Sequence, residues 1–497
     1  MTTLPLFERV IEHGDRIAVQ DKTHQTTYAE LLRRSELVAA HLLAGHNDLN
    51  EARVGFLIPA GPEYVAVQWG IWRAGGIAVP LSLSAVEKEL EYTLTDAEIS
   101  RVVVAPDLTS RVRELCLRYN LPLTHVDHIP AASSVSLPEV DPSRRAMMLF
   151  TSGTTGQPKG VVSTHTCIQA QIESLVKAWH WQSEDCIPLF LPLHHIHGII
   201  NVMSCALWSG GRIDTFPVFD SELILKGVSA DTWSVFMAVP TIYVKLIAAI
   251  EALHETERQP VIDGFGRMRL MISGSAALPA SVHSQWTTLT GQKLLERYGM
   301  TEIGMALSNP YSGERRPGAV GQPLPGVSIR LWSEHQTVVA AENTPGEIHV
   351  KGPCVFHEYW NRPDATESAF LEGWFQTGDI AILQDGYYRI MGRSSVDIIK
   401  SGGYKLSALE IEAALLDHPA ISECAVVGIP DGTWGETVSA AVVLCPGGSL
   451  KLHELRSWCK DKISSYKIPH HMKTIESLPR NAMGKVTKPA VTKLFTQ

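Results

Sequence analysis

Short apolar runs alternate with amphipathic stretches from the start of the chain to about residue 330. The runs "ARVGFLIP" (52–59) and "RVVVAP" (101–106) have the length and composition of strands. The stretch "TYAELLRRSELVAAHLLA" (27–44) instead carries apolar residues at helical spacing. This alternation predicts α/β layers and argues against a helical bundle or an all-β sandwich.

The pattern changes after residue 345. "GEIHVKGPC" and "GWFQTGDIAILQDGYYRIMGR" read as strands and turns, and Asp385-Gly386 is a strong hairpin signal. A new unit begins near Arg393 to Ser395, with a helix expected at about 407–417. We therefore predict a large N-terminal domain (1–392) of α/β layers plus a small β subdomain, and a mobile small α+β C-terminal domain (393–497).

The composition narrows the class of protein. A chain of 497 residues exceeds what one hydrophobic core usually serves, and 45% apolar with 19% charged residues fits a globular protein. The net charge of -9 argues against nucleic acid as a partner. The eight cysteines form no C-x-x-C pair, which favours reduced structural thiols. Without a charged leader or an apolar run of about 18 residues, we expect a cytoplasmic protein that does not span a membrane.

The stretch "LFTSGTTGQPKG" (149–160) combines hydroxyls, glycines and one lysine. Glycine lets the main chain approach an anion closely, so this composition suits a phosphate-binding turn. The Walker pattern does not fit, because Pro158 precedes Lys159 and Gly160 follows it. The stretch therefore indicates nucleotide binding without a P-loop fold, with an ordinary polar turn as the alternative.

Five further motifs follow in order: "SGSAALP" (273–279), "ERYGMTEIG" (296–304), "FQTGDIA" (375–381), "GRSSVDIIKSGGYKLSALEIE" (392–412) and "PRNAMGKVTK" (479–488). Over nearly its whole length the chain thus resembles the adenylate-forming superfamily of acyl-CoA synthetases, peptide-synthetase adenylation domains and luciferases. The resemblance implies that a carboxylic acid reacts with ATP to give an acyl adenylate and pyrophosphate, before the acyl group passes to a thiol. No carrier-protein domain is expected in the chain, so free coenzyme A is the implied acceptor.

The resemblance also implies an ATP site. Its expected members are Thr151, Ser152, Gly153, Thr154, Thr155, Gly156, Lys159, Ser273, Gly274, Ser275, Tyr298, Gly299, Met300, Thr301, Asp379, Arg393 and Lys485. Tyr298 would stack on adenine, Asp379 would bind the ribose hydroxyls with help from Arg393, and Glu302 would bind Mg²⁺. Taken alone, Tyr298 reads as a core aromatic and Asp379 as a turn residue. A catalytically dead family member is disfavoured, because every implied ATP contact is present.

Three residues have implied catalytic roles: Lys485, Thr301 and His195. Lys485 would enter the site from the small domain and stabilise the charge that develops at the α-phosphate, and Lys488 is the alternative lysine. Ser401, Gly402 and Gly403 would line the path of coenzyme A. The family commonly has Asp or Lys two residues after the motif arginine. Here Ser395 stands there, which leaves the hinge residue open.

The acid is indicated by Arg297, which directly precedes Tyr298. That arginine, with "PLHHIHG" (192–198) and "GERRPGAVGQPLPGV", resembles malonyl-CoA synthetases. Arginine offers a planar fork that grips a carboxylate, Ser275 adds a hydroxyl, and His195 and His197 would form polar wall. Arg297 could instead be a structural ion-pair partner of Glu296 or a neighbouring Asp. The acid could also be a short, medium-chain or aryl monocarboxylate. A metal site at the histidines 194, 195 and 197 is disfavoured, because no Cys or carboxylate stands at ligand spacing.

Overall fold

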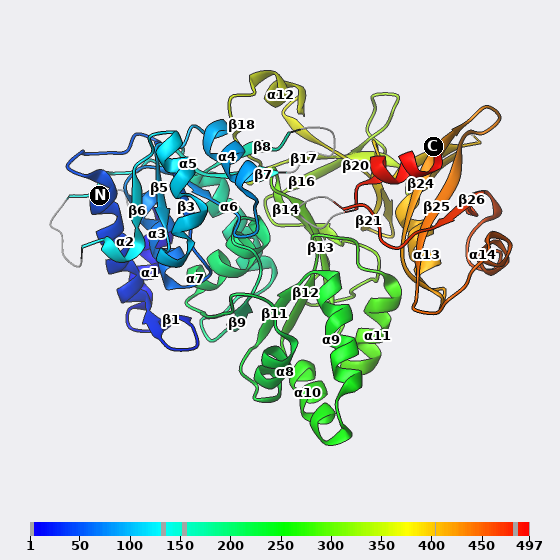
Figure 1. Ribbon diagram of the computed structural model, residues 1–497, viewed down its shortest axis with the longest axis horizontal. Coiled ribbons are helices and arrows are strands. Elements are labelled where there is room, and N and C mark those ends of the chain that lie inside the picture. The colour runs from blue at the N-terminus through cyan, green and yellow to red at the C-terminus, as the bar shows by residue number, and fades with distance from the viewer. Residues whose placement is uncertain (1–3, 131–135, 152–156, 403, 481–485, 497) are drawn as a thin grey trace.

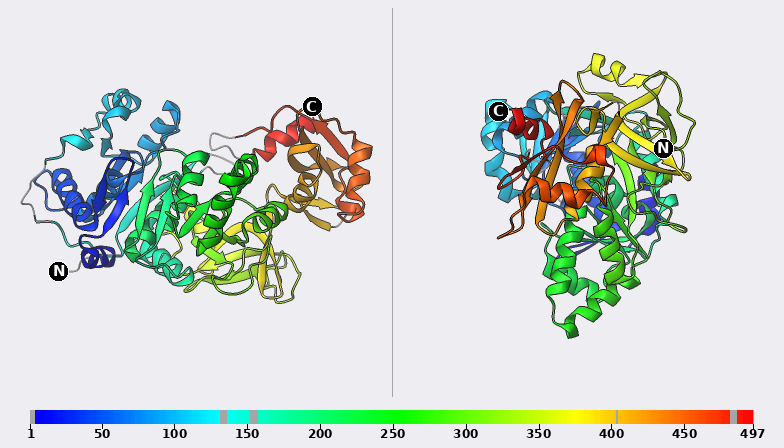
Figure 2. Two further views of the ribbon diagram at one scale, coloured as in Figure 1. Left: turned by 90° about the horizontal axis from the view of Figure 1, so that it is seen from below. Right: turned by 90° about the vertical axis from the view of Figure 1, so that its right-hand side faces the viewer.

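The computed structural model describes residues 4–130, 136–151, 157–402, 404–480 and 486–496. Figure 1 shows a large N-terminal part built from several sheets with helices packed around them, and a smaller part near the C-terminus. Helices α1 (Pro5–His13) and α15 (Lys488–Thr496) lie near opposite ends of the longest axis (Figures 1 and 2). The predicted fold class, α/β layers with a small C-terminal domain, is confirmed.

A seven-stranded sheet near the N-terminus has the order β18-β8-β7-β4-β3-β5-β6. Its strands are β3 (Arg53–Leu57), β4 (Ile77–Pro80), β5 (Arg101–Val104), β6 (Leu123–His125), β7 (Arg145–Thr151), β8 (Lys159–Thr164) and β18 (Glu358–Tyr359). The helices around it are α2 (Tyr28–Leu43), α3 (Pro62–Arg73), α4 (Glu87–Asp96), α5 (Arg113–Arg118) and α6 (His165–Ala178).

Both faces of this sheet are buried. Val54 and Phe56 of β3 belong to the core shared with α2 and α3, whereas Leu57 belongs to a second core with residues of α4 and α5. Side chains alternate between the faces of a strand, so a sheet covered on both sides needs nearly continuous apolar strands. This requirement explains the apolar runs in the sequence.

Helices α2 and α3 cross closely. α2 begins with a capping box, in which Thr27 and Glu30 bind each other's backbone N–H groups, and α3 begins at Pro62. A Cβ on Gly70 would lie 2.5 Å from Cγ1 of Val38 and 2.9 Å from the carbonyl oxygen of Ser35. The crossing therefore depends on a glycine in the middle of a helix.

Two more sheets complete the α/β part. One has the order β2-β1-β10-β9 and the other β11-β12-β13-β14-β15. Their strands are β1 (Ile17–Gln20), β2 (Gln25–Thr27), β9 (Cys186–Leu189), β10 (Arg212–Thr215), β11 (Val235–Ala238), β12 (Leu270–Ser273), β13 (Leu295–Met300), β14 (Gly304–Ser308) and β15 (Gln322–Pro323). Helices α7 (Cys205–Ser209), α8 (Ser221–Ser229), α9 (Pro240–Ala252), α10 (Glu255–Arg267) and α11 (Ala280–Thr290) pack nearby (Figure 1).

The expected β subdomain is present. It consists of β16 (Ser328–Trp332), β17 (Gly346–Lys351), β19 (Phe370–Leu371), β20 (Trp374–Gln384) and β21 (Tyr387–Arg393), with α12 (Pro363–Ser368) beside it. Asp385 and Gly386 join β20 to β21, and both have positive φ angles, 47° and 77°. Two positive φ angles are typical of the type I′ hairpin turn that the dipeptide predicts.

The C-terminal part has its own sheet and its own apolar core. β22 (Ile398–Ser401), β23 (Tyr404–Ser407), β24 (Ile421–Asp431), β25 (Gly435–Leu444) and β26 (His471–Thr474) pack with α13 (Ala408–Leu416), α14 (Leu452–Cys459) and α15. Its two buried clusters run from Ile399 to Val491, whereas those of the large part end at Tyr388. The domain boundary at 392/393 stays a prediction. No helix in the described ranges is long and apolar enough to cross a membrane.

We predict that Gly70→Ala destabilises the protein. Alanine improves helix propensity by about 1 kcal/mol, but overpacking against Val38 and a backbone oxygen costs roughly 1 to 3 kcal/mol. The net effect is a lower melting temperature, measured by thermal unfolding. Gly432→Ala is the control, because a Cβ there would meet nothing within 4 Å. A melting temperature of Gly70→Ala at or above that of the wild type would contradict the close crossing.

Candidate active site

Arg297 lies inside β13, beside the point where the parallel strand β12 ends. Ser273 of β12 is opposite Glu296 of β13, so the segment that leaves β12 passes beside Arg297. Nη2 of Arg297 donates a hydrogen bond to Oγ of Ser275 at 3.1 Å. A Cβ on Gly274 would lie only 2.5 Å from Cζ of Arg297. The guanidinium therefore lies directly against backbone that only glycine leaves open.

The charge of Arg297 has no counter-charge in the described part of the chain. The residue is 4% exposed, its Nε has no hydrogen-bond acceptor there, and no described carboxylate is within ion-pairing distance. Burial lowers the pKa of Arg297 to about 10, so the group stays charged at neutral pH. The alternative pairing with Glu296 is not found, because neighbouring residues of a strand point to opposite faces. Glu296 instead accepts a hydrogen bond from the N–H of Gly318 at 2.8 Å.

Ser275 and His197 complete this polar group. Ser275 has a φ of 70°, a conformation that costs roughly 1 to 3 kcal/mol outside glycine and often occurs at functional sites. Its Oγ is 3.2 Å from Nδ1 of His197. Burial holds the pKa of His197 well below its usual range, so the imidazole is neutral. His197 begins the π-helical segment η3 (His197–Ser204), and π-helical turns are frequent at functional sites.

A second polar group joins Tyr298, Asp379 and Arg393. The Tyr298 hydroxyl donates to Oδ2 of Asp379 at 2.6 Å, and Nε of Arg393 donates to Oδ1 at 3.1 Å. Asp379 and Arg393 are paired across β20 and β21. Burial raises the pKa of Asp379, while Arg393 and the Tyr298 hydroxyl oppose that rise. The structure thus brings Tyr298 together with Asp379 and Arg393, although Tyr298 and Asp379 are 81 positions apart in the sequence.

A third group contains Glu302, Tyr359 and Lys159. The Tyr359 hydroxyl donates to Oε1 of Glu302 at 3.0 Å. Nζ of Lys159 lies 4.6 Å from the centre of the Tyr359 ring, close enough for a cation–π contact. Burial raises the pKa of Glu302. A buried carboxylate of this kind is a ligand that a hard cation such as Mg²⁺ prefers.

Several predicted site residues lie outside the described ranges. They are Ser152, Gly153, Thr154, Thr155 and Gly156 of the phosphate loop, Gly403 and Lys485. The two ends of the loop are described: Thr151 pairs with Lys159 across β7 and β8, so the loop joins two antiparallel strands. Within the described ranges, no three His, Cys, Asp or Glu side chains gather to hold a metal ion. The rings of His194 and His195 are 4.1 Å apart.

Two family models match the chain. The AMP-binding enzyme model covers residues 6–360, and the AMP-binding enzyme C-terminal domain model covers residues 410–485. The chain belongs to the AMP-binding enzyme family. The resemblance drawn from the motifs is therefore confirmed.

Relatives and solved structures agree with this assignment. A human protein named malonate–CoA ligase ACSF3, mitochondrial, is 44% identical over 99% of this chain and 92% of its own length. A malonate–CoA ligase of Arabidopsis thaliana is 38% identical over 97% of this chain and 86% of its own length. The crystal structure of ATP-bound MatB from Rhodopseudomonas palustris aligns with a TM-score of 0.89 at 31% identity, covering 100% and 99% of the two chains.

Two of the three predicted coenzyme A residues of this AMP-binding enzyme, Ser401 and Gly402, lie at the end of β22. Ser401 is buried, and the N–H of Gly402 donates to the carbonyl of Trp434 at 2.9 Å. Gly402 has a φ of 56°, and a Cβ there would lie 3.0 Å from the Trp434 ring. The glycine is therefore required by both the turn and the tryptophan. The role of these residues in binding coenzyme A stays a prediction.

Three polar or aromatic residues near these groups were missed in the sequence. Tyr359 connects Glu302 with Lys159, Trp434 packs on Gly402, and Asn201 in η3 is buried with both amide atoms unpartnered among the described residues. None of the three stands in a motif. Their positions follow from tertiary contacts between segments distant in sequence.

We predict that Glu296→Gln changes the pH dependence of stability. Burial raises the pKa of Glu296 from 4.5 to about 8. The folded state then holds a proton that the unfolded state has lost, so Glu296 costs stability progressively as pH rises from about 4.5 to 8. The stability advantage of Gln over Glu should grow by at least about 1 kcal/mol between pH 5 and pH 8.5, as measured by urea unfolding.

The exposed Glu342 serves as control, since Glu342→Gln removes the same formal charge at the surface. A stability difference for Glu296→Gln that does not change with pH, or that shrinks as pH rises, would show that Glu296 is ionised in the folded protein.

Proposed function

We propose that this AMP-binding enzyme joins a small dicarboxylic acid, malonate or methylmalonate, to coenzyme A through an acyl adenylate, with release of AMP and pyrophosphate. The observation that carries the proposal is the buried charge of Arg297, which has no counter-charge among the described residues. An unpaired buried cation is costly, and a substrate carboxylate would relieve that cost. The names of the human and Arabidopsis relatives support the same acid.

One carboxylate of the acid would bind Arg297, and the other would react. Nη2 of Arg297 already contacts Ser275, while Nε has no described acceptor. Ser275 and the neutral His197 would add polar contacts without adding charge. A fatty acid would leave the arginine buried without a partner, which a site built for a polar contact rejects strongly. His195 would contribute to the wall of this pocket.

The phosphates of ATP would lie at the loop between Thr151 and Lys159, with Lys159 contributing positive charge. Glu302 fits Mg²⁺, because it is a buried carboxylate and hard cations prefer oxygen ligands. When bound, Mg²⁺ supplies positive charge that neutralises the phosphates. Thr301 would contact the α-phosphate, with Ser273, Gly274, Gly299 and Met300 forming adjacent backbone.

Asp379 would bind the ribose, and Tyr298 would stack on adenine. Asp379 is held in place by the hydrogen bonds from Tyr298 and Arg393, and a carboxylate has further lone pairs for sugar hydroxyls. Lys485 would place its charge between the reacting carboxylate and the α-phosphate, where negative charge develops. After the C-terminal domain rotates, the segment at Ser401 to Gly403 would line the path of the coenzyme A thiol.

We also propose a cytoplasmic location. The eight cysteines are free thiols, which fits a reducing compartment. Residues Leu6, Phe7 and Val10 of α1 are buried in the main core. This stretch is therefore part of the fold. The vertebrate relatives carry the word mitochondrial in their names, so cell fractionation is the decisive comparison.

The acid specificity can be measured as pyrophosphate release with malonate, methylmalonate, succinate, acetate, octanoate and benzoate. We expect malonate or methylmalonate to give the highest kcat/KM. In Arg297→Met the malonate value should fall by on the order of 10² to 10³-fold, whereas the low acetate value should change little. Arg297→Lys keeps the positive charge but loses the planar fork of donors, so its kcat/KM for malonate should lie between the values of the wild type and Arg297→Met. Higher turnover of octanoate or benzoate than malonate in the wild type would sink the proposed substrate class.

A further inference from the structure

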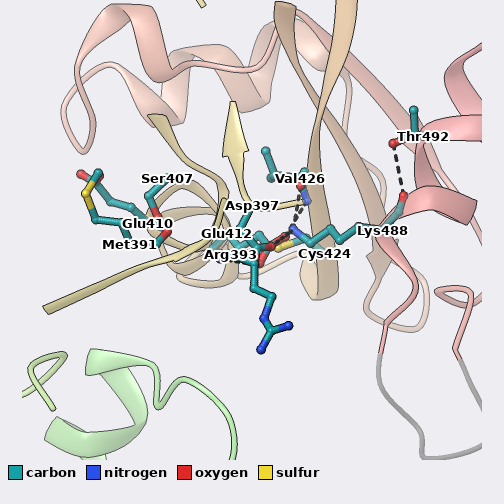
Figure 3. A network of polar contacts seen from close by, with 10 residues as sticks. All are labelled: Met391, Arg393, Asp397, Ser407, Glu410, Glu412, Cys424, Val426, Lys488 and Thr492. Carbon is teal, nitrogen blue, oxygen red and sulfur yellow. Dashed lines mark hydrogen bonds and ion pairs between the residues drawn. The ribbon is translucent and has the colours of Figure 1, made fainter. Parts of the chain in front are cut away.

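The C-terminal domain contains a buried lysine whose charge is balanced by two carboxylates. Nζ of Lys488, the first residue of α15, pairs with Oε1 of Glu412 and donates to the carbonyl of Val426 at 2.7 Å (Figure 3). It also lies 3.4 Å from Oδ1 of Asp397. The side chains of Lys488, Asp397 and Glu412 are 12%, 13% and 14% exposed. Such a group is rigid, because breaking one pair leaves a charge buried alone.

Asp397 connects this buried group to the turn that joins the two parts of the chain. Its Oδ2 accepts the backbone N–H of Arg393 at 3.0 Å, and its own N–H donates to the Arg393 carbonyl at 2.8 Å. Ser395, the residue that leaves the identity of the hinge open, lies between these two positions in the sequence. Arg393 in turn donates to Asp379 in the large domain. Polar contacts thus run from Asp379 through the turn to Lys488.

Lys488 also holds one end of the segment that contains Lys485. On either side of residues 481–485, Arg480 forms an antiparallel bridge with Val486, and the N–H of Thr487 donates to the carbonyl of Pro479 at 2.8 Å. Lys488 follows directly after Thr487. The described flanks of the segment are therefore paired with each other, and the ion pairs of Lys488 attach them to α13 and to the turn at Arg393–Asp397.

We propose that Lys488 is a positioning residue, which through Asp397 and Glu412 fixes the flank Val486–Thr487, next in the chain to Lys485, to the turn at Arg393–Asp397. This inference rests on the proposed function, in which Lys485 serves adenylation. Catalysis by a single long side chain depends on where its backbone is held, and a misplacement of about 1 Å can cost roughly 10²-fold in rate. Lys488 itself, turned inward onto Glu412 (Figure 3), does not act on the substrate.

The test separates the two half-reactions of Lys488→Met. Adenylation is measured as pyrophosphate release with malonate, and thioester formation is measured from supplied malonyl adenylate and coenzyme A. We expect kcat for adenylation to fall by on the order of 10²-fold, with the KM for malonate nearly unchanged. The rate of thioester formation should stay within about threefold of the wild-type rate, because Gly402 is held separately by Trp434. Lys488→Arg should restore most of the adenylation rate, because it restores the positive charge.

Lys467→Met is the matched control. Lys467 is also a C-terminal-domain lysine paired with α13, through Glu410 at 2.6 Å, and its side chain is 18% exposed. Its ion pair does not involve Asp397 or Glu412. Its adenylation rate should stay near that of the wild type. If Lys488→Met proves too unstable to purify, Asp397→Asn takes its place, because it removes one charge of the group at similar size and should give the same selective loss.

Equal loss of both half-reactions, or a lower melting temperature with adenylation unchanged, would overturn the positioning role and leave a structural one. Failure of Lys488→Arg to rescue would overturn it as well. Lys485→Ala distinguishes failure of the positioning role of Lys488 from failure of the proposed function. If Lys485→Ala still adenylates malonate, the proposed role of Lys485 is wrong, whatever the results for the Lys488 variants. If Lys485→Ala does not adenylate malonate, the Lys488 variants test the positioning role alone.

Discussion

The uncompensated charge of Arg297 is the constraint around which the acid site is built. A guanidinium at 4% exposure with no described counter-charge is expensive to fold. Three local features surround the guanidinium. They are the glycine at 274, where an added Cβ would clash with the guanidinium, the serine at 275 with its positive φ, and the buried neutral His197. Each of these features costs stability or restricts the sequence, which is expected of a site that is completed by its substrate.

Two buried cations, Lys488 and Arg297, have opposite environments. Lys488 pairs with two carboxylates, so its charge is satisfied within the protein and serves to hold segments together. Among the described residues, Arg297 has one side-chain partner, the Ser275 hydroxyl, and its Nε has none. The buried carboxylate partners of Lys488 suit a role in the framework, whereas a buried guanidinium without a described carboxylate partner is free to bind a substrate carboxylate.

Much of the fold and the family followed from the sequence. Apolar runs at strand length, alternating with amphipathic stretches, predicted the α/β layers, and Asp385-Gly386 predicted a hairpin whose two positive φ angles are now seen. Ordered motifs gave the family. The sequence alone could not decide whether Arg297 pairs with Glu296. In the folded sheet the two side chains point to opposite faces of β13, and Glu296 binds Gly318 instead. The contacts of Tyr359 with Glu302 and of Lys488 with Asp397 join positions far apart in the chain, and no local pattern encodes them.

The central claim is that Arg297 recognises a second carboxylate. Malonate and its monomethyl ester test it most directly, because the ester keeps the carboxylate that reacts and lacks the one that Arg297 would bind. The measurement is the ratio of kcat/KM for the two acids, in the wild type and in Arg297→Met. The account predicts a wild-type preference for malonate on the order of 10²-fold or more, and loss of most of that preference in the variant. The same ratio in both proteins would contradict it.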